Sequence, residues 1–142
     1  MSEVINAADL HTYLECDFGT GKLFWKVRPL EMFEQEFVGK RWNDRYAGKE
    51  AFTSSDGHGY LVGNIKRIRY QAHRVVFAIA NGRWPSGLID HIDLDKKNNR
   101  PENLREATRQ QNTWNKGLTV QNKSGFKGVS LHAGTGRWIS QV

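Results

Sequence analysis

A stretch of 26 residues, from Asp90 to Asn115, constrains the fold of this 142-residue chain more than any other feature. Its sequence is DHIDLDKKNNRPENLREATRQQNTWN, and it follows a short apolar run that predicts a strand ending at Asp90-His91. A polar loop comes next, then an extended return beginning at Asn103, then a helix for which Thr108 is a suitable N-cap. This order of strand, loop, strand and helix is expected to bring polar side chains from its parts to one point.

The polar residues of this stretch suit metal-assisted hydrolysis of a phosphodiester. His91 can act as a general base, because an imidazole is the side chain best suited to proton transfer near neutral pH. The carboxylate of Asp90 is a hard ligand for Mg²⁺ or Mn²⁺, and Asn112 on the helix could add an amide oxygen. Asn103 could hold its amide against the ring or backbone of His91 and so fix the orientation of the base. Because Mg²⁺ keeps several waters, two protein ligands are sufficient.

Basic residues are concentrated on both sides of this stretch in the sequence. Residues 57–89 contain five basic and no acidic residues, and residues 117–142 contain three basic and no acidic residues. A positive surface around such a centre favours a polyanion, so double-stranded DNA is the expected partner. The side chains expected to bind DNA are Lys66, Arg67 and Arg69 on a β-hairpin, Arg105 and Arg109 beside the candidate site, and Lys127 near the C-terminus.

Composition excludes several classes of protein. The chain is 38% hydrophobic and 25% charged, as expected for a soluble globular protein. It has no apolar run of about 18 residues and no basic segment at its N-terminus, so we expect neither a membrane partner nor a secretory signal, and a cytoplasmic location. Cys16 is the only cysteine, which excludes an internal disulfide and a cysteine-rich zinc site. No motif implies a protein partner, although a homodimer could serve double-strand cleavage.

The rest of the chain predicts short helices and strands. The predicted elements are a helix over residues 3–16, a strand over 22–26, a polar irregular segment over 28–49, a β-hairpin over 60–71, a buried helix over 73–81 and strands over 126–131 and 137–142. His73 is expected to be a hydrogen-bonded core residue. Asn98 and Asn99 are expected to shape the loop, and Asn115 to cap the end of its helix.

Residues 90–115 resemble the HNH nuclease motif, also called the ββα-metal or His-Me finger motif. Asp90-His91 matches its first position, Asn103 in Asn-Leu-Arg its middle Asn, and Asn112 its third position. An Asn at the third position, where the namesake pattern has His, resembles the phage and intron homing endonucleases. This resemblance implies His91 as general base, Asn103 as the residue that orients it, and one Mg²⁺ or Mn²⁺ on Asp90 and Asn112.

Residues 124–142 resemble the first strands of the Apetala-type (ethylene-response-factor) DNA-binding domain. The resemblance rests on Ser-Gly-Phe-Lys-Gly-Val and the later Gly-Arg-Trp. The expected organisation is an HNH nuclease domain over 1–116 with its motif at 88–116, a linker over 117–123, and this partial module over 124–142. The expected fold class is α+β: a ββα-metal motif with an N-terminal β-hairpin and helix part and a small, partial C-terminal β-sheet.

Together these features predict a metal-dependent DNA endonuclease of the phage homing type. One metal site per chain predicts that a monomer nicks, while a double-strand break needs a dimer or two encounters. The first alternative is a non-catalytic DNA-binding protein that retains the HNH scaffold. The second is a ribonuclease, but the sequence has no obvious aromatic platform on which unpaired bases could stack.

Overall fold

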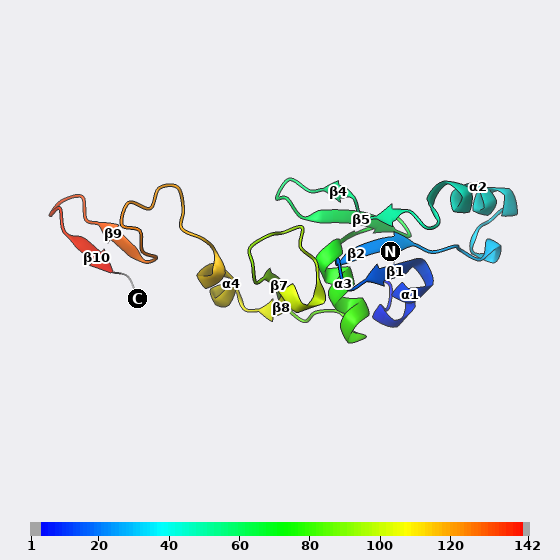
Figure 1. Cartoon of the computed structure of the whole chain (residues 1–142), viewed down its shortest axis with the longest axis horizontal. Coiled ribbons are helices and arrows are strands. Elements are labelled where there is room, and N and C mark those ends of the chain that lie inside the picture. Colours follow the sequence, from blue (N-terminus) through cyan, green and yellow to red (C-terminus); the bar gives the residue numbers. More distant parts are fainter. Residues whose placement is uncertain (1–3, 141–142) are drawn as a thin grey trace.

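The computed structural model describes residues 4–140 and has an α+β architecture, which confirms the expected fold class. Figure 1 shows an elongated arrangement, with β9 and β10 at the end farthest from α2 and with α3 among the N-terminal sheets. The helices are α1 (Leu10–Tyr13), α2 (Glu36–Tyr46), α3 (Ala72–Asn81) and α4 (Arg109–Asn115), with 3-10 turns at Ala7–Asp9, Leu30–Met32 and Pro101–Asn103. Within the described residues, none of these helices has the length and apolar character needed to cross a membrane.

The strands of the described residues form four small antiparallel sheets. Two lie before α3 in the chain, one forms the candidate motif, and one lies near the C-terminus. They are β1 (Leu14–Asp17), β2 (Lys22–Trp25) and β3 (Glu50–Ala51); β4 (Ser54–Ser55), β5 (Leu61–Ile65) and β6 (Ile68–Gln71); β7 (Leu88–His91) and β8 (Leu104–Ala107); and β9 (Val129–Leu131) and β10 (Trp138–Ser140).

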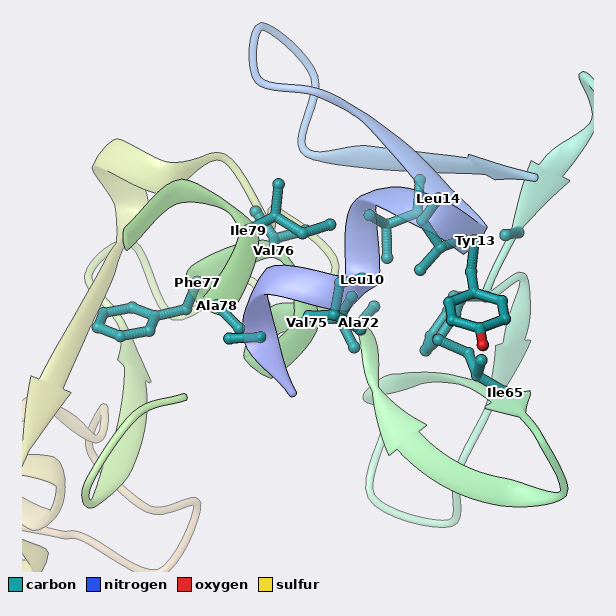
Figure 2. Close-up of a cluster of buried hydrophobic side chains, with 14 of the residues drawn as sticks. Leu10, Tyr13, Leu14, Ile65, Ala72, Val75, Val76, Phe77, Ala78 and Ile79 are labelled. Atoms are coloured by element: carbon teal, nitrogen blue, oxygen red, sulfur yellow. The ribbon is translucent and has the colours of Figure 1, made fainter. Parts of the chain in front are cut away.

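Helix α3 is the centre of the hydrophobic core. Its residues Val75, Val76 and Ala78 are completely buried, and Figure 2 shows Leu10 of α1 beside Val75. Burying a side chain such as Val or Leu contributes roughly 1.5–3 kcal/mol, so this packing is the main term that holds the N-terminal part together. The helix ends at Gly82, whose φ of +69° is the left-handed conformation that glycine adopts readily at a helix C-terminus.

Two predictions for the N-terminal part were wrong in detail. Residues 14–16 lie in β1 and not in a helix, because the buried Leu14 takes an extended conformation and pairs with Trp25 of β2. Residue 3, where that helix was expected to begin, lies outside the described residues. The segment over 28–49 is not irregular but contains α2. That helix has only one buried residue, Gly39, and packs through the ring of Trp42. Its sequence therefore shows no apolar stripe from which a helix could be predicted.

The predicted strand, loop, strand and helix of the motif are confirmed. Strands β7 and β8 pair with Asp90 opposite Arg105 and His91 opposite Leu104. Helix α4 then begins after Thr108, whose hydroxyl accepts a hydrogen bond from the backbone N–H of Gln111. The side chain of Gln111 accepts one in return from the N–H of Thr108, which completes a capping box.

Near the C-terminus, β9 and β10 form a two-stranded antiparallel sheet around the expected turn. Leu131 lies opposite Trp138, and both side chains are about half exposed. Residues 141–142, into which the second strand was expected to continue, lie outside the described residues. The division of the chain at residues 117–123 stays a prediction.

Candidate functional site

A pocket of about 300 Å³ brings together three of the predicted site residues. Asp90 and His91 at the end of β7 line it, and Asn112 lines it from α4. The sequence order of strand and helix therefore does place a carboxylate, an imidazole and an amide around one space. The other lining residues are His58, Tyr60, Ile89, Leu94, Lys96 and Lys116.

Asp90 is a buried carboxylate with a partner on each oxygen. Its Oδ2 accepts from Nε and Nη2 of Arg105, at 3.1 and 2.8 Å, as their opposed positions on β7 and β8 allow. Its Oδ1 accepts from Nδ2 of Asn115 at 3.0 Å, and the same Nδ2 donates to the backbone oxygen of His91 at 2.9 Å. Asn115 therefore ties α4 to the end of β7, a larger role than the helix cap that its position in the sequence suggested.

The side chains around this pocket fit a hard divalent cation held by few protein ligands. Among residues 4–140, no three His, Cys, Asp or Glu side chains gather closely enough to hold a metal ion. Protein ligation would therefore depend on Asp90 and on amide oxygens such as that of Asn112. A carboxylate offers about four lone-pair positions, and the three hydrogen bonds to Asp90 leave one on Oδ1. Oxygen ligands supplemented by water are the set that Mg²⁺ and Mn²⁺ accept.

The ring of His91 is held by a residue that sequence reasoning assigned only to loop shape. Nε2 of His91 lies 2.9 Å from Oδ1 of Asn99, whose side chain is completely buried. With Oδ1 of Asn99 facing this nitrogen, the arrangement favours the neutral ring with its proton on Nε2 and its lone pair on Nδ1, because an amide oxygen only accepts. This tautomer leaves Nδ1 as the nitrogen that can take a proton.

The structure places Asn103 in the loop and does not place its amide against the His91 ring. Oδ1 of Asn103 accepts from the backbone N–H of Asp93, and its Nδ2 donates to the carboxylate of Asp93 and to the backbone oxygen of Asn98. Its backbone oxygen accepts from Ile92, next to His91. The reason is geometric: Asn103 immediately precedes β8, where its side chain reaches across the loop, whereas Asn99 lies within the loop and reaches the ring.

Two aromatic rings pack beside the ring of His91. The ring centroids of His73 and Tyr60 lie 5.1 and 5.9 Å from that of His91. His73 is buried as predicted, but its Nδ1 is buried without a hydrogen-bond partner, contrary to the expected hydrogen-bonded histidine. Burial first, and then the charges of His91 and Arg74, lower the pKa of His73 to about 3. His73 is therefore neutral at physiological pH.

Two lysines at the pocket were not singled out by the sequence. Nζ of Lys96 donates to the backbone oxygen of His58 at 2.7 Å and lies 4.8 Å from the ring centroid of Tyr60. Lys116, just after α4, lines the same pocket. The only signal for Lys96 was the Lys-Lys pair in an otherwise polar loop, which says nothing of where the side chain points. Two cations at this pocket favour an anionic substrate.

The residues predicted to bind DNA lie in three separate places. Lys66 and Arg67 form the tip of the β5–β6 hairpin, and Arg69 is exposed on β6. Arg105 is paired with Asp90, while Arg109 is exposed at the first turn of α4. Lys127 donates to the backbone oxygen of Trp114 at the end of α4.

Comparison with known proteins addresses the family directly. Residues 70–113 match a family model described as HNH endonuclease. This part of the chain is therefore similar to HNH endonucleases. The matched segment includes α3 and the whole β7–β8 unit, with Asp90, His91, Asn99, Asn103 and Asn112. The match ends at residue 113 and does not support the resemblance of residues 124–142 to the Apetala-type domain, which stays a prediction.

Two curated relatives have viral names. The chain is 40% identical over 87 residues to a protein named "Uncharacterized HNH endonuclease L560" from Acanthamoeba polyphaga mimivirus. It is also 40% identical over 71 residues to "Protein 3.8" of Escherichia phage T7. These matches cover 60% and 49% of this chain, and this chain spans 41% and 59% of the two relatives' lengths.

One solved structure is also similar. Its title is "DNA binding and cleavage by the HNH homing endonuclease I-HmuI". The TM-score is 0.49 at 22% sequence identity, and the match covers 80% of this chain and 57% of that chain.

The buried His73 predicts how stability depends on acid. Its folded pKa of about 3 lies below the unfolded value of 6.5, so the unfolded chain binds a proton that the folded chain excludes. The stabilising contribution is complete above pH 6.5 and is lost as pH falls toward 3. In His73→Phe this decrease in the free energy of unfolding at acid pH, on the order of a few kcal/mol, should be absent.

Urea unfolding at pH 7.5, 6 and 4.5 measures this difference. His73→Phe should keep more of its stability at pH 4.5 than the wild type does. His11→Ala is the matched control, because it also replaces a histidine but one that is exposed. Parallel acid limbs in the wild type and His73→Phe would contradict a neutral, buried His73.

Proposed function

We propose that this chain is a DNA endonuclease that hydrolyses phosphodiester bonds with His91 as general base and a divalent metal ion, Mg²⁺ or Mn²⁺, on Asp90 and Asn112. The observation that carries this proposal is the pocket that Asp90, His91 and Asn112 line together. The match of residues 70–113 to the HNH endonuclease family model supports it, as does the name of the mimivirus relative.

The reaction assigns one task to each side chain. Nδ1 of His91 takes a proton from a water molecule, and the oxygen of that water forms a bond to phosphorus while the bond to the 3′ oxygen breaks. The products are a 5′ phosphate and a 3′ hydroxyl, the latter protonated from solvent. When bound, the metal ion would stabilise the negative charge that develops on the leaving 3′ oxygen.

Lys96 and Lys116 would hold the scissile phosphate close to the base. Their positive charges lie at the same pocket as Asp90 and His91, where a phosphate would otherwise meet the negative carboxylate. The ion pair with Arg105 also offsets that carboxylate, at 2.8 Å. The pocket therefore presents an excess of positive charge to the DNA backbone, in keeping with the basic residues that surround the motif in the sequence.

The pairing of Arg105 with Asp90 is the one observation that favours the alternative of a non-catalytic DNA-binding protein. A guanidinium on the carboxylate opposes a divalent cation at the same group, because the two positive charges repel. The remaining lone-pair position on Oδ1 and the presence of a base with a fixed tautomer favour the enzyme. Cleavage assays decide between the two.

Incubation with supercoiled plasmid tests the proposed activity. With Mg²⁺ or Mn²⁺ the wild type should convert the plasmid to nicked circles, since one site cuts one strand. EDTA should abolish the reaction, and His91→Ala should slow it by about 10²–10⁴-fold, the usual contribution of a general base. His11→Ala, which replaces an exposed histidine of α1, should nick at the wild-type rate.

Each other result has a definite meaning. Binding without cleavage under both metals would contradict the nuclease and support the non-catalytic alternative. Linear product from the first turnover would point to a homodimer with paired sites. Cleavage of RNA in place of DNA would support the ribonuclease. Undiminished nicking by His91→Ala would place the base elsewhere.

The tip of the β5–β6 hairpin is proposed to contact DNA. Lys66 and Arg67 both have positive φ, 50° and 66°, although neither residue type favours that conformation. Asn-Gly is the usual sequence for such a two-residue turn, so the two basic residues place positive charge at the tip at the expense of turn preference. A two-stranded ribbon of this kind fits the major groove of DNA.

Replacing Lys66-Arg67 by Asn-Gly tests this role without disturbing the turn. The double variant should fold at least as stably as the wild type, because Asn-Gly adopts positive φ more readily. Its DNA affinity should fall, and the slope of log K against log salt should become shallower by about 0.9 for each phosphate that the hairpin tip no longer neutralises. Fluorescence anisotropy over a salt series measures both. An unchanged slope would exclude the hairpin tip from the DNA interface.

A further inference from the structure

We infer that the turn between β1 and β2 helps to position the general base. The turn packs against the backbone of Asn99 and holds it in place, and Asn99 fixes the tautomer of His91. This inference rests on the proposed nuclease function for its effect on catalysis, but its structural content is independent of that activity. It gives the N-terminal hairpin, whose turn lies about 70 residues before His91 in the sequence, a direct part in the site.

Gly21 is the point where the turn meets the loop. It is buried and has a φ of +72°. A Cβ placed on Gly21 would lie 2.2 Å from the carbonyl carbon of Asn99, 2.5 Å from its oxygen and 2.4 Å from the nitrogen of Arg100. The backbone of the turn therefore packs directly on the backbone that carries Asn99. No side chain fits between them, so any larger residue at 21 must push the two segments apart.

Hydrogen bonds within the turn fix its conformation, so it can hold the packed loop in position. The carboxylate of Asp17 accepts from the backbone N–H of Gly19 at 2.9 Å and from the hydroxyl of Thr20 at 2.8 Å. The backbone oxygen of Asp17 accepts from the N–H of Gly21 at 2.7 Å. These bonds close the turn on itself, and its strands are paired from Leu14–Trp25 to Asp17–Lys22.

Asn99 needs a packing partner to fix its position, because it lies in a long loop between β7 and β8. Within residues 4–140, its amide oxygen is the one hydrogen-bond partner of the His91 ring. The rings of His73 and Tyr60 restrict where the imidazole lies, but ring packing does not choose between Nδ1–H and Nε2–H. A shift of a few tenths of an ångström in the loop would therefore weaken the one hydrogen bond that selects the tautomer.

Gly21→Ala tests the packing of the turn on the backbone of Asn99, and it has two matched controls. Gly48 and Gly82 also have positive φ, 76° and 69°, but a Cβ on either would meet nothing within 4 Å. Gly48→Ala and Gly82→Ala therefore reproduce the backbone strain of Gly21→Ala without its clash. Asn99→Leu and Asn99→Asp test the hydrogen bond itself, because Leu keeps the volume without an acceptor and Asp restores an acceptor.

The tautomer of His91 is measured by ¹H–¹⁵N correlation of the imidazole in metal-free protein, at a pH where the ring is neutral. The wild type, Asn99→Asp and both control glycine variants should give the Nε2–H form. Asn99→Leu should lose this preference, and Gly21→Ala should lose part of it. In nicking assays, kcat should fall by about 10- to 100-fold for Asn99→Leu and by a smaller factor for Gly21→Ala, with KM little changed.

The inference is overturned if Asn99→Leu retains the Nε2–H form, or if Gly21→Ala matches Gly48→Ala and Gly82→Ala in spectrum and kcat. Asn99→Asp and the glycine variants keep the test decisive if Asn99→Leu fails to fold. Failure of the proposed function gives a different pattern, in which the wild type does not nick although its imidazole spectrum shows the Nε2–H form. The spectrum then still decides whether the turn and Asn99 fix the tautomer.

Discussion

The amide of Asn115 is the interaction on which the candidate site depends. Its Nδ2 donates both to the carboxylate of Asp90 and to the backbone oxygen of His91, at 3.0 and 2.9 Å. Helix α4 has only seven residues, too few to be stable alone, so it needs such bonds to β7 and its packing on β8. The same bonds set the position of Asn112, one turn earlier on α4, relative to the carboxylate and the imidazole.

The buried carboxylate of Asp90 requires partners that offset its negative charge. A carboxylate this deeply buried is costly unless it is paired and hydrogen-bonded, and Arg105 and Asn115 provide those partners. The pairing holds the carboxylate in one orientation at the pocket. It also limits the affinity for a divalent cation, since the guanidinium and the cation compete for the same negative group. Binding of a DNA phosphate beside the cation would add negative charge and relieve that competition.

Sequence reasoning recovered the parts of the site that are adjacent in the chain. The strand ending at His91, the return through Leu104 and the helix capped by Thr108 all have local signals, which are an apolar run, a polar loop and a capping residue. Helix α2 was missed because it packs through the ring of Trp42 and not through an apolar stripe. Asn103 was expected to hold the ring or backbone of His91, whereas Asn99 contacts the ring, because the conformation of a polar loop cannot be read from its composition. The packing of Gly21 on that loop has no local signal at all.

Chemical rescue tests the central claim, proton transfer by His91, most directly. A His91→Gly protein should nick supercoiled plasmid far more slowly than the wild type, and added imidazole should restore the rate in a concentration-dependent way, because the free base can occupy the space left by the side chain. The restored reaction should still require Mg²⁺ or Mn²⁺. A His91→Gly protein that nicks at the wild-type rate without imidazole would contradict the account.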